Sequence, residues 1–335
     1  MQQVVNLVKR GMRQAYQDIK ALDTAMTNIA VVTDMSIQEL WGKIDQYMSI
    51  AQQYGVTTQG VYEVSQLYYQ QGLSTNEVMA ATTETLKLAR IAGMDYKDAA
   101  DAMTVAIRSF KMEMDDAQRV TDVYSKVAAI TASDSEELAV AMSKTASSAE
   151  SVGSSFENTT AMLAVMVETT RESAQNLGSA LKSIISRYGE MKAGKTTDED
   201  GEAIYYNKVD QALASVGISL KDAQGQFRDF DDVIFELSKK WDSLDKNTQR
   251  YIATIMAGNR QQSRFIALVD NWERLDEVSQ AAADSADAGL LQYAKTLDSL
   301  DTKLNSIKTS FQEFYMNIVN GPVIGGILEA INSLI

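Results

Sequence analysis

The chain has 335 residues, of which 45% are hydrophobic and 23% are charged, so it holds enough apolar material for one large or two ordinary globular units. It contains no cysteine and no histidine, which excludes disulfides, thiolate nucleophiles, imidazole metal ligands, and Ser-His or Cys-His catalytic pairs. The net charge of −14 argues against sequence-independent binding of nucleic acid or anionic lipid, and no stretch reaches the roughly 18 uninterrupted apolar residues of a membrane span.

Proline occurs once, at Pro322, while residues that favour helix fill the rest of the sequence. Because the main helix breaker is nearly absent, the sequence predicts an all-α fold. We expect an array of short helices separated by glycines, flanked by two long helices with a heptad pattern.

The first predicted element is a long helix near residues 3–31, within an N-terminal heptad region of residues 1–35. Apolar residues recur there at alternating spacings of three and four, which is the 3.5-residue period of a coiled-coil seam. The same spacing also fits one helix that packs inside its own domain. The residues of this predicted seam are Val5, Val8, Met12, Ala15, Ile19, Leu22, Met26 and Ile29.

Residues 36–190 are predicted to form a helical core whose corners repeat one pattern of three residues. A glycine takes the left-handed conformation that ends a helix, an apolar residue packs back on that helix, and a Ser, Thr or Asp caps the next helix. The Ala-, Ser-, Thr- and Met-rich stretch 145–170 is interpreted as a tightly packed helical hairpin. The three-residue pattern occurs in this core at residues 55–57, 72–74 and 93–95, and again outside it at residues 217–219.

Capping boxes mark further helix starts, because a Ser followed three residues later by a Glu satisfies two backbone N–H groups reciprocally. Such boxes are predicted at Ser36, Ser74, Ser133 and Ser154. Together with the corners, they predict helices near residues 37–54, 59–71, 76–92, 96–110, 115–131, 134–150, 155–169, 172–189, 204–216, 231–242, 246–256 and 260–284.

Two segments depart from the helical pattern. Residues 191–203 are rich in acidic side chains and are predicted to form a solvated surface loop. Residues 218–230 fit a small β-hairpin around the turn at Gln224 and Gly225, because apolar side chains flank that turn on both sides. The hairpin lies within a second helical part of the chain, residues 204–285.

A second heptad helix is predicted near residues 289–319, within a coiled-coil region of residues 286–320. Two seams around a compact middle favour an assembly of several copies, which we expect to be a trimer or a hexamer. After Pro322 an apolar helix begins within residues 321–335, and we expect it to continue in sequence beyond this chain, where any membrane contact would lie. The second seam consists of Leu290, Tyr293, Leu297, Leu300, Leu304, Ile307, Phe311, Phe314 and Ile318.

No catalytic, cofactor, nucleotide or metal site is expected, and neither a Gly-x4-Gly-Lys-Ser/Thr phosphate loop nor a Gly-x-Gly-x-x-Gly dinucleotide motif is recognised. Asp198, Asp200 and Gly201 resemble the start of a calcium loop, but the later oxygen ligands and the bidentate glutamate are missing. Adjacent carboxylates such as Asp231 and Asp232 are interpreted as solvated positions rather than as a glycosidase pair, because neighbours on a helix face different directions.

Several motifs along the chain resemble one known family. The first series comprises residues 22–26, 54–57, 71–74 and 86–93. More specific are the stretches 217–222, 225–230 and 257–265, in which the key positions are Gly217, Ile218, Asp222, Gly225, Phe227, Gly258, Arg260, Arg264 and Phe265. With these motifs, the sequence from about Leu22 to Ile318 resembles the conserved region of phage tail tape-measure, or minor tail, proteins.

The resemblance implies a structural, non-enzymatic component of the virion tail, made in the bacterial host cytoplasm. Such a protein fills the tail lumen in several copies, sets tail length as the tube polymerises around it, and leaves ahead of the DNA at infection. The implied partners are other copies of the chain, tail-tube and tail-tip proteins, and tail assembly chaperones, with no specific binding to nucleic acid and no cofactor. Much of the measuring length is expected in sequence outside this chain.

Three other interpretations fit parts of the sequence. A chemoreceptor-like signalling coiled coil shares the composition but requires long uninterrupted heptads, which the glycine corners break. A tail-associated cell-wall hydrolase requires a catalytic pair that the sequence does not resolve. A secreted helical effector, or a contractile-injection relative of the tape-measure family, is compatible with the composition.

Overall fold

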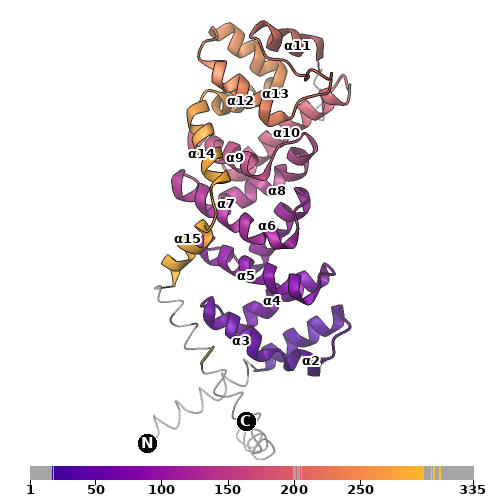
Figure 1. Ribbon diagram of the computed structural model, residues 1–335, viewed down its shortest axis with the longest axis vertical. Helices are drawn as coiled ribbons and strands as arrows, with labels where there is room; N and C mark the ends of the chain where they lie inside the picture. The colour runs from indigo at the N-terminus through magenta and orange to yellow at the C-terminus, as the bar shows by residue number, and fades with distance from the viewer. Residues whose placement is uncertain are drawn as a thin grey trace, which may run out of the picture. The chain divides into compact units, whose positions relative to one another are not determined.

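The computed structural model describes residues 19–198 and 206–297, together with residues 17, 201, 204, 303, 305, 309 and 310. Regular structure in this part of the chain is helical, without a β-strand, which confirms the all-α prediction (Figure 1). Tertiary contacts divide the chain into two compact units. Unit 1 comprises residues 1–90, 95–100 and 293–335, and unit 2 comprises residues 91–94 and 101–292.

Residues 19–32 form the first described helix. The helices that follow it in chain order are α2 (Ile37–Trp41), α3 (Ile44–Gln53), α4 (Thr58–Gln70), α5 (Thr75–Ala92), α6 (Tyr96–Ser109), the 3-10 turn η1 (Met114–Asp116), α7 (Ala117–Ile130), α8 (Ser135–Ser151), α9 (Phe156–Thr170), α10 (Ala174–Lys192), α11 (Tyr206–Ser215), α12 (Phe230–Trp241), α13 (Lys246–Val269), α14 (Trp272–Ala283) and α15 (Ala288–Thr296).

Glycine corners end α3, α4 and α5 as predicted. Gly55, Gly72 and Gly93 have φ angles of 57°, 78° and 70°, in the left-handed region that favours glycine. At the first corner, the Val56 N–H donates to a carbonyl of α3 at 3.0 Å, and the Thr57 hydroxyl oxygen accepts from a backbone N–H of α4 at 3.1 Å. The three-residue pattern therefore ends one helix and begins the next.

The fourth corner differs after its second residue. Gly217 ends α11 with a φ of 73°, and Ile218 packs into the core with 1% of its surface exposed. Ser219 does not begin a helix, and its hydroxyl donates to the Lys221 carbonyl at 2.6 Å. The chain continues from this point into an irregular loop.

Tyrosines and hydroxyl groups form much of the core of unit 1. The rings of Tyr47 in α3 and Tyr62 in α4 stack with centroids 4.1 Å apart and planes 5° from parallel. The Tyr68 hydroxyl of α4 shares a hydrogen bond with the Thr85 hydroxyl of α5. This core therefore joins its helices through polar contacts as well as apolar ones.

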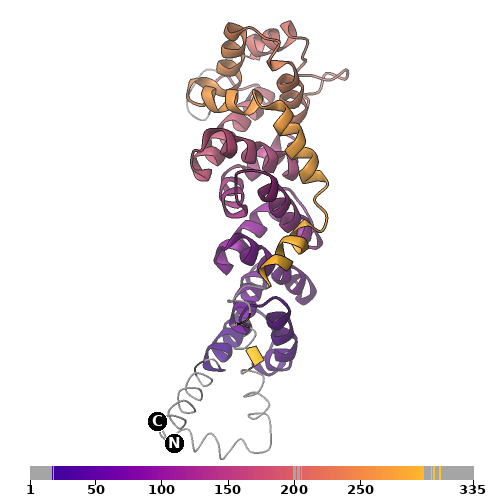
Figure 2. The same cartoon turned by 90° about the vertical axis from the view of Figure 1, so that its left-hand side faces the viewer.

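Helix α9 is the central helix of unit 2. Helices α7, α8, α10, α13 and α14 all pack against it, and α14, drawn in orange, runs along α7 and α9 in both views (Figures 1 and 2). Residues 161–167 of α9 are apolar on every side and are all buried, as a helix surrounded by other helices requires. Its contact with α8 agrees with the hairpin expected over residues 145–170.

Helices α8 and α10 pack closely because Gly178 has no side chain. A Cβ atom at this position would overlap the backbone carbonyl of Ala141. The Thr145 hydroxyl donates to the Gly178 carbonyl at 2.6 Å, so a polar contact fixes the same crossing point. The small residues of α8 thus serve helix packing.

Two predicted helices are interrupted. The helix at 37–54 is interrupted at Gly42, which separates α2 from α3. The helix at 260–284 is interrupted between α13 and α14, where the Asn271 side chain donates to the Ala267 carbonyl at 2.8 Å and satisfies a helix-end acceptor. Of the helix predicted at 289–319, residues 289–296 belong to α15 and residues 303, 305, 309 and 310 are also helical, while the other residues after 297 lie outside the described part of the chain.

Two of the predicted capping boxes are wrong by one residue. The N-cap of α8 is Asp134 rather than Ser133, in a capping box with Glu137, and the N-cap of α9 is Ser155 rather than Ser154, whose side chain accepts from the Asn158 N–H without a reciprocal glutamate. Both N-caps have the extended backbone that lets a side-chain oxygen reach the first turn of the helix. The box at the start of α2 is confirmed.

Candidate functional site

The motif at residues 217–230 folds into a tight loop that leads into α12. The Asp222 carboxylate accepts hydrogen bonds from two backbone N–H groups of the turn, at 2.9 and 2.8 Å, and Gly225 has a φ of 79°. Lys221 and Phe227 form one isolated antiparallel bridge. The predicted β-hairpin is reduced to this bridge. The Asp222 N–H donates to the Gln226 carbonyl at 2.9 Å and the Arg228 N–H to the Leu220 carbonyl at 3.0 Å, but neither side extends into a strand before α12 begins.

The motif glycine Gly258 breaks α13. Its φ of 71° and ψ of 172° are not helical, which agrees with the gap predicted between the helices at 246–256 and 260–284. A break in a helix leaves carbonyls without their usual partners. Buried Arg187 of α10 supplies a replacement: its Nε donates to the Ile255 carbonyl at 3.1 Å.

Arg187 also forms an ion pair with Asp198, one of the acidic residues that resemble a calcium loop. The Arg187 side chain is 4% exposed and the Asp198 side chain is 12% exposed, so two charges are largely removed from water together. Arg187 thus ties the segment after α10 to the broken end of α13. Asp198 acts here as a structural carboxylate.

The motif residues after Gly258 join α13 to the rest of unit 2. Arg264 holds the Glu172 carboxylate in two places, with Nε 3.0 Å from Oε1 and Nη2 2.5 Å from Oε2. These hydrogen bonds lower the pKa of Glu172. Phe265 is fully buried, and its ring lies 6.3 Å from that of Trp241 in an edge-to-face arrangement. Arg260, in contrast, is exposed.

The heptad residues that the structure describes fall into two groups. In the N-terminal seam, Leu22, Met26 and Ile29 are fully buried within one chain, and Ile19 is half-buried. In the second seam, Tyr293 is buried, whereas 52% of Leu290 and 39% of Leu297 are exposed. The remaining predicted seam residues, which lie outside the described part of the chain, are Val5, Val8, Met12, Ala15, Leu300, Leu304, Ile307, Phe311, Phe314 and Ile318.

The carboxylates at 231 and 232 do not form a catalytic pair. Asp232 is exposed, whereas Asp231 is 7% exposed and accepts hydrogen bonds from the Ser154 hydroxyl, the Ser155 N–H and the Asn158 amide at 2.5, 3.0 and 2.7 Å. Burial raises the pKa of Asp231. This carboxylate therefore joins α12 to the start of α9, and its predicted interpretation as a solvated position was wrong.

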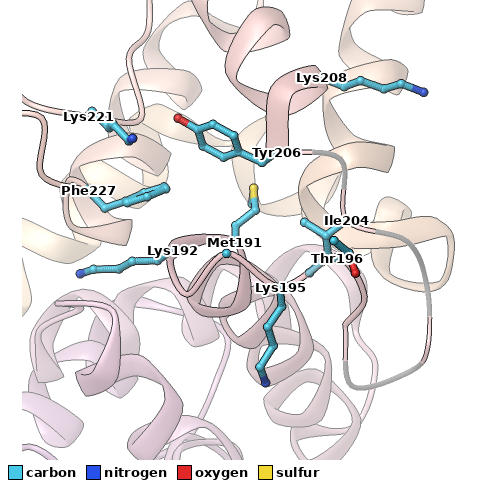
Figure 3. Close-up of a pocket in the computed structure, with 10 residues that line it drawn as sticks. Met191, Lys192, Lys195, Thr196, Ile204, Tyr206, Lys208, Lys221 and Phe227 are labelled. Carbon is cyan, nitrogen blue, oxygen red and sulfur yellow. The ribbon is translucent and has the colours of Figure 1, made fainter.

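A cavity of about 610 Å³ lies between the end of α10, the start of α11 and the 217–230 loop (Figure 3). Met191 and Ile204 are buried in its wall, and the half-buried rings of Tyr206 and Phe227 meet edge to face, 5.8 Å apart. Among the ten lining residues that the structure describes, four are lysines and none is acidic. Phe227 is the family-motif residue that takes part in this cavity.

The expectation of no nucleotide motif was wrong at the level of the pattern, because residues 189–196 have the order Gly-x4-Gly-Lys-Thr of a phosphate-binding loop. Such a loop needs free backbone N–H groups at the start of a helix. Here the segment ends α10, and the N–H groups of Ala193, Gly194 and Lys195 donate to carbonyls within the segment at 2.9, 3.0 and 2.9 Å. The arrangement does not form a phosphate cradle.

Neither a metal cluster nor a membrane helix occurs in the described residues. No group of three or more acidic side chains there could hold a metal ion. No helix in the same part of the chain is both long and apolar enough to cross a membrane.

The chain is thus an all-helical protein whose distinctive motif residues make structural contacts within turns and between helices. The family model described as phage-related minor tail protein matches residues 44–258, which is more than half of the sequence. The chain belongs to this family, which confirms the resemblance seen in the motifs and places the protein in the virion tail.

One relative bears on the role within the tail. The chain is 24% identical over 268 residues to a tape measure protein of Pneumococcus phage Dp-1. The match covers 79% of this chain and 22% of that protein, so the chain spans about a fifth of the length of this curated relative. No solved structure matches the chain significantly.

Proposed function

We propose that this chain is a non-enzymatic segment of a tape measure protein, which fills the tail lumen in several copies and sets tail length as the tube polymerises. It leaves the tail ahead of the DNA at infection. The observation that carries the proposal is the match of 79% of the chain to a protein named as a tape measure. The partners are tail-tube and tail-tip proteins and tail assembly chaperones.

The physical character of the chain supports this role. Its net charge of −14 disfavours tight binding to DNA that passes through the same tube. Its helices are joined by glycine corners, so the folded segment is far shorter than the roughly 500 Å that 335 residues would span as one helix at about 1.5 Å per residue. The measuring length therefore lies mainly in other parts of the full protein.

Self-association of this segment is part of the proposal. Leu290 and Leu297 are seam positions of one predicted heptad helix, and both expose a large part of their apolar surface. Pairing of these positions between copies would remove that surface from water, at about 25 cal/mol for each Å² buried. We expect a trimer or a hexamer.

A deletion in the phage tests the proposed role. A phage whose gene lacks residues 44–258 should assemble no tails of a defined, wild-type length, as measured by electron microscopy of negatively stained particles. The control is a phage with Lys144→Gln, an exposed position on α8. Normal tails in normal number from the deletion phage would contradict a tape-measure role for this segment.

A further inference from the structure

Helix α15 is capped by a carboxylate that belongs to another helix. Asp122 of α7 is 4% exposed, and its carboxylate accepts hydrogen bonds from the backbone N–H groups of Asp287 and Gly289, at 3.0 and 2.8 Å. These N–H groups lie at the start of α15, where a helix lacks internal partners and carries partial positive charge. Asp122 therefore fixes the first turn of α15 against α7.

Two further features show that contact with α7 sets the start of α15. At Gly289 a Cβ atom would lie 2.8 Å from Thr121 Cγ2 and 2.9 Å from Asp122 Oδ1, so only glycine permits this approach. Asp287 has a φ of 63°, in the left-handed region that side chains disfavour, and the Gln118 amide donates to its carboxylate at 3.3 Å. We call the contacts of Gln118, Thr121 and Asp122 with Asp287 and Gly289 the α7–α15 clasp.

Contacts within one chain cover one side of the predicted second seam. In its heptad, Leu290 and Leu297 are a positions, Tyr293 is the d position between them, and Gly289 is a g position, which borders d. Gly289 and Tyr293 are buried, whereas 52% of Leu290 and 39% of Leu297 are exposed. A complete seam pairs both a and d positions with another copy. While these contacts hold, α15 offers only the a side.

The d position is docked by residues of unit 1. The Tyr293 hydroxyl donates to the Gln53 carbonyl at 3.4 Å, and the Tyr293 ring lies 5.6 Å from the ring of Tyr54. Transfer of Tyr293 into a seam between copies breaks both contacts. The apparent affinity between copies is therefore reduced by the fraction of molecules in which α15 is free, and each contact that holds α15 lowers that fraction.

We propose that the α7–α15 clasp is an autoinhibitory contact, which holds α15 on its own chain and weakens association between copies until it opens. The inference rests on the proposed self-association and adds its regulation. The partner of the opened seam is a second copy of this chain, because Leu290, Tyr293 and Leu297 in heptad order match the same residues of another copy. Asp122 is the positioning residue of the clasp.

A reversible disulfide tests the clasp, because the chain contains no cysteine of its own. In the double variant Thr121→Cys with Gly289→Cys, the 2.8 Å between Thr121 Cγ2 and a Cβ at residue 289 brings the two sulfurs within bonding reach. Light scattering over a range of concentrations measures the mass of the whole chain. We expect the oxidised variant to stay monomeric and the reduced variant to associate at least as tightly as wild type. Wild type in the same two buffers is the control.

Two single variants should open the clasp. Gly289→Ala adds a Cβ that meets α7 while alanine favours helix, so docking weakens without loss of helix propensity. Asp122→Asn removes the charge that caps α15. Each should lower the dissociation constant for self-association about tenfold. The control is Asp284→Asn, which removes one charge at an exposed position and should change that constant by less than about twofold.

Hydrogen exchange of the peptide that covers residues 285–292 reports the clasp independently of association. Exchange should be faster in Gly289→Ala and Asp122→Asn than in wild type, because the amides at residues 287 and 289 lose their acceptor. Addition of Leu290→Asp and Leu297→Asp to Asp122→Asn should restore the monomer. Association that persists in this triple variant would show that the released surface is not the seam.

The outcomes separate the clasp from the self-association on which it rests. If wild type associates, equal association of the oxidised and reduced double variant would overturn the clasp and leave self-association standing. Opening variants that associate no more tightly than wild type would do the same. If every variant and wild type stay monomeric at all concentrations while exchange shows α15 released, both the self-association and its regulation by the clasp are contradicted.

Discussion

Replacement of Gly258 by alanine should destabilise unit 2 measurably, because this residue has a backbone conformation that side chains oppose. Its φ of 71° and ψ of 172° fall in a region that is occupied almost only by glycine. Strain of this kind costs on the order of 1–3 kcal/mol. If the break in α13 moved to relieve this strain, the Ile255 carbonyl would also move. It would then lose the hydrogen bond that it accepts from Arg187 Nε at 3.1 Å.

The size of the effect follows from these contacts. A loss of about 2–3 kcal/mol corresponds to a fall in melting temperature of roughly 4–12 °C for a domain of about 150–250 residues. The control is Gly225→Ala, at an exposed turn with a φ of 79° where an added Cβ meets no heavy atom within 4 Å. Left-handed strain alone should cost that variant about 1–2 kcal/mol.

Far-UV circular dichroism melting, combined with hydrogen exchange of α13 peptides, measures both variants. We expect Gly258→Ala to melt lower than Gly225→Ala and to lose protection around the break in α13. A Gly258→Ala protein that melts within about 1 °C of the wild type would refute the link between this motif glycine and the stability of unit 2.

Three further predictions follow from other contacts. Since burial raises the pKa of Asp231, its folded state holds the proton more tightly than the unfolded state, and its contribution to stability falls as pH rises from the unfolded pKa through the folded pKa. In urea denaturation across that acidic range, the free energy of unfolding of the wild type should therefore fall relative to that of Asp231→Asn as pH rises. A difference that stays constant or changes in the opposite direction would contradict the raised pKa of Asp231. Arg187→Met removes the guanidinium from Asp198 and should lower the free energy of unfolding by about 3 kcal/mol and speed trypsin cleavage after α10; unchanged stability and cleavage would show that the pair is dispensable. Leu290→Asp with Leu297→Asp should abolish self-association in light scattering while leaving the melting temperature of the monomer unchanged, since both side chains are exposed in one chain, and an oligomer that persists would exclude this seam.

Local signals in the sequence predicted most of the helices because each acts over a few residues. The left-handed glycines at 55, 72 and 93 and the capping box of α2 depend on contacts within one corner, and they were confirmed. Caps displaced by one residue at α8 and α9 show the limit of such signals. Ser133 and Asp134, like Ser154 and Ser155, are neighbouring side chains that can both cap, and tertiary contacts decide between them. The Ser154 hydroxyl donates instead to Asp231 of α12.

Contacts between distant residues were not predictable from spacing. Arg187 and Ile255 lie far apart in the sequence, and nothing in the order of residues indicates that a buried arginine would meet a carbonyl near the Gly258 break. The cavity similarly combines side chains from three separate segments. The phosphate-loop pattern at 189–196 is a sequence signal that leads to it, although the structure assigns those residues to a helix end.

Assignment of residues to the two units was equally hidden from local patterns. Residues 293–297 belong to the same unit as residues 19–90, a relationship that only tertiary contacts define. The heptad spacing predicted an apolar face on each of the two seam helices. It left open whether that face packs within one chain or against another copy. Full burial of Leu22, Met26 and Ile29 and exposure of Leu290 show that the two seams are not equivalent.

Quantitative mass spectrometry of purified virions, before and after triggered DNA ejection, tests the tape-measure role most directly. Tryptic peptides from α9 to α13, counted against a tail-tube protein, should show several copies of this segment in each intact tail and their loss from emptied particles. Absence of these peptides from intact virions, or their full retention after DNA has left, would contradict a segment that fills the tail lumen and departs ahead of the genome.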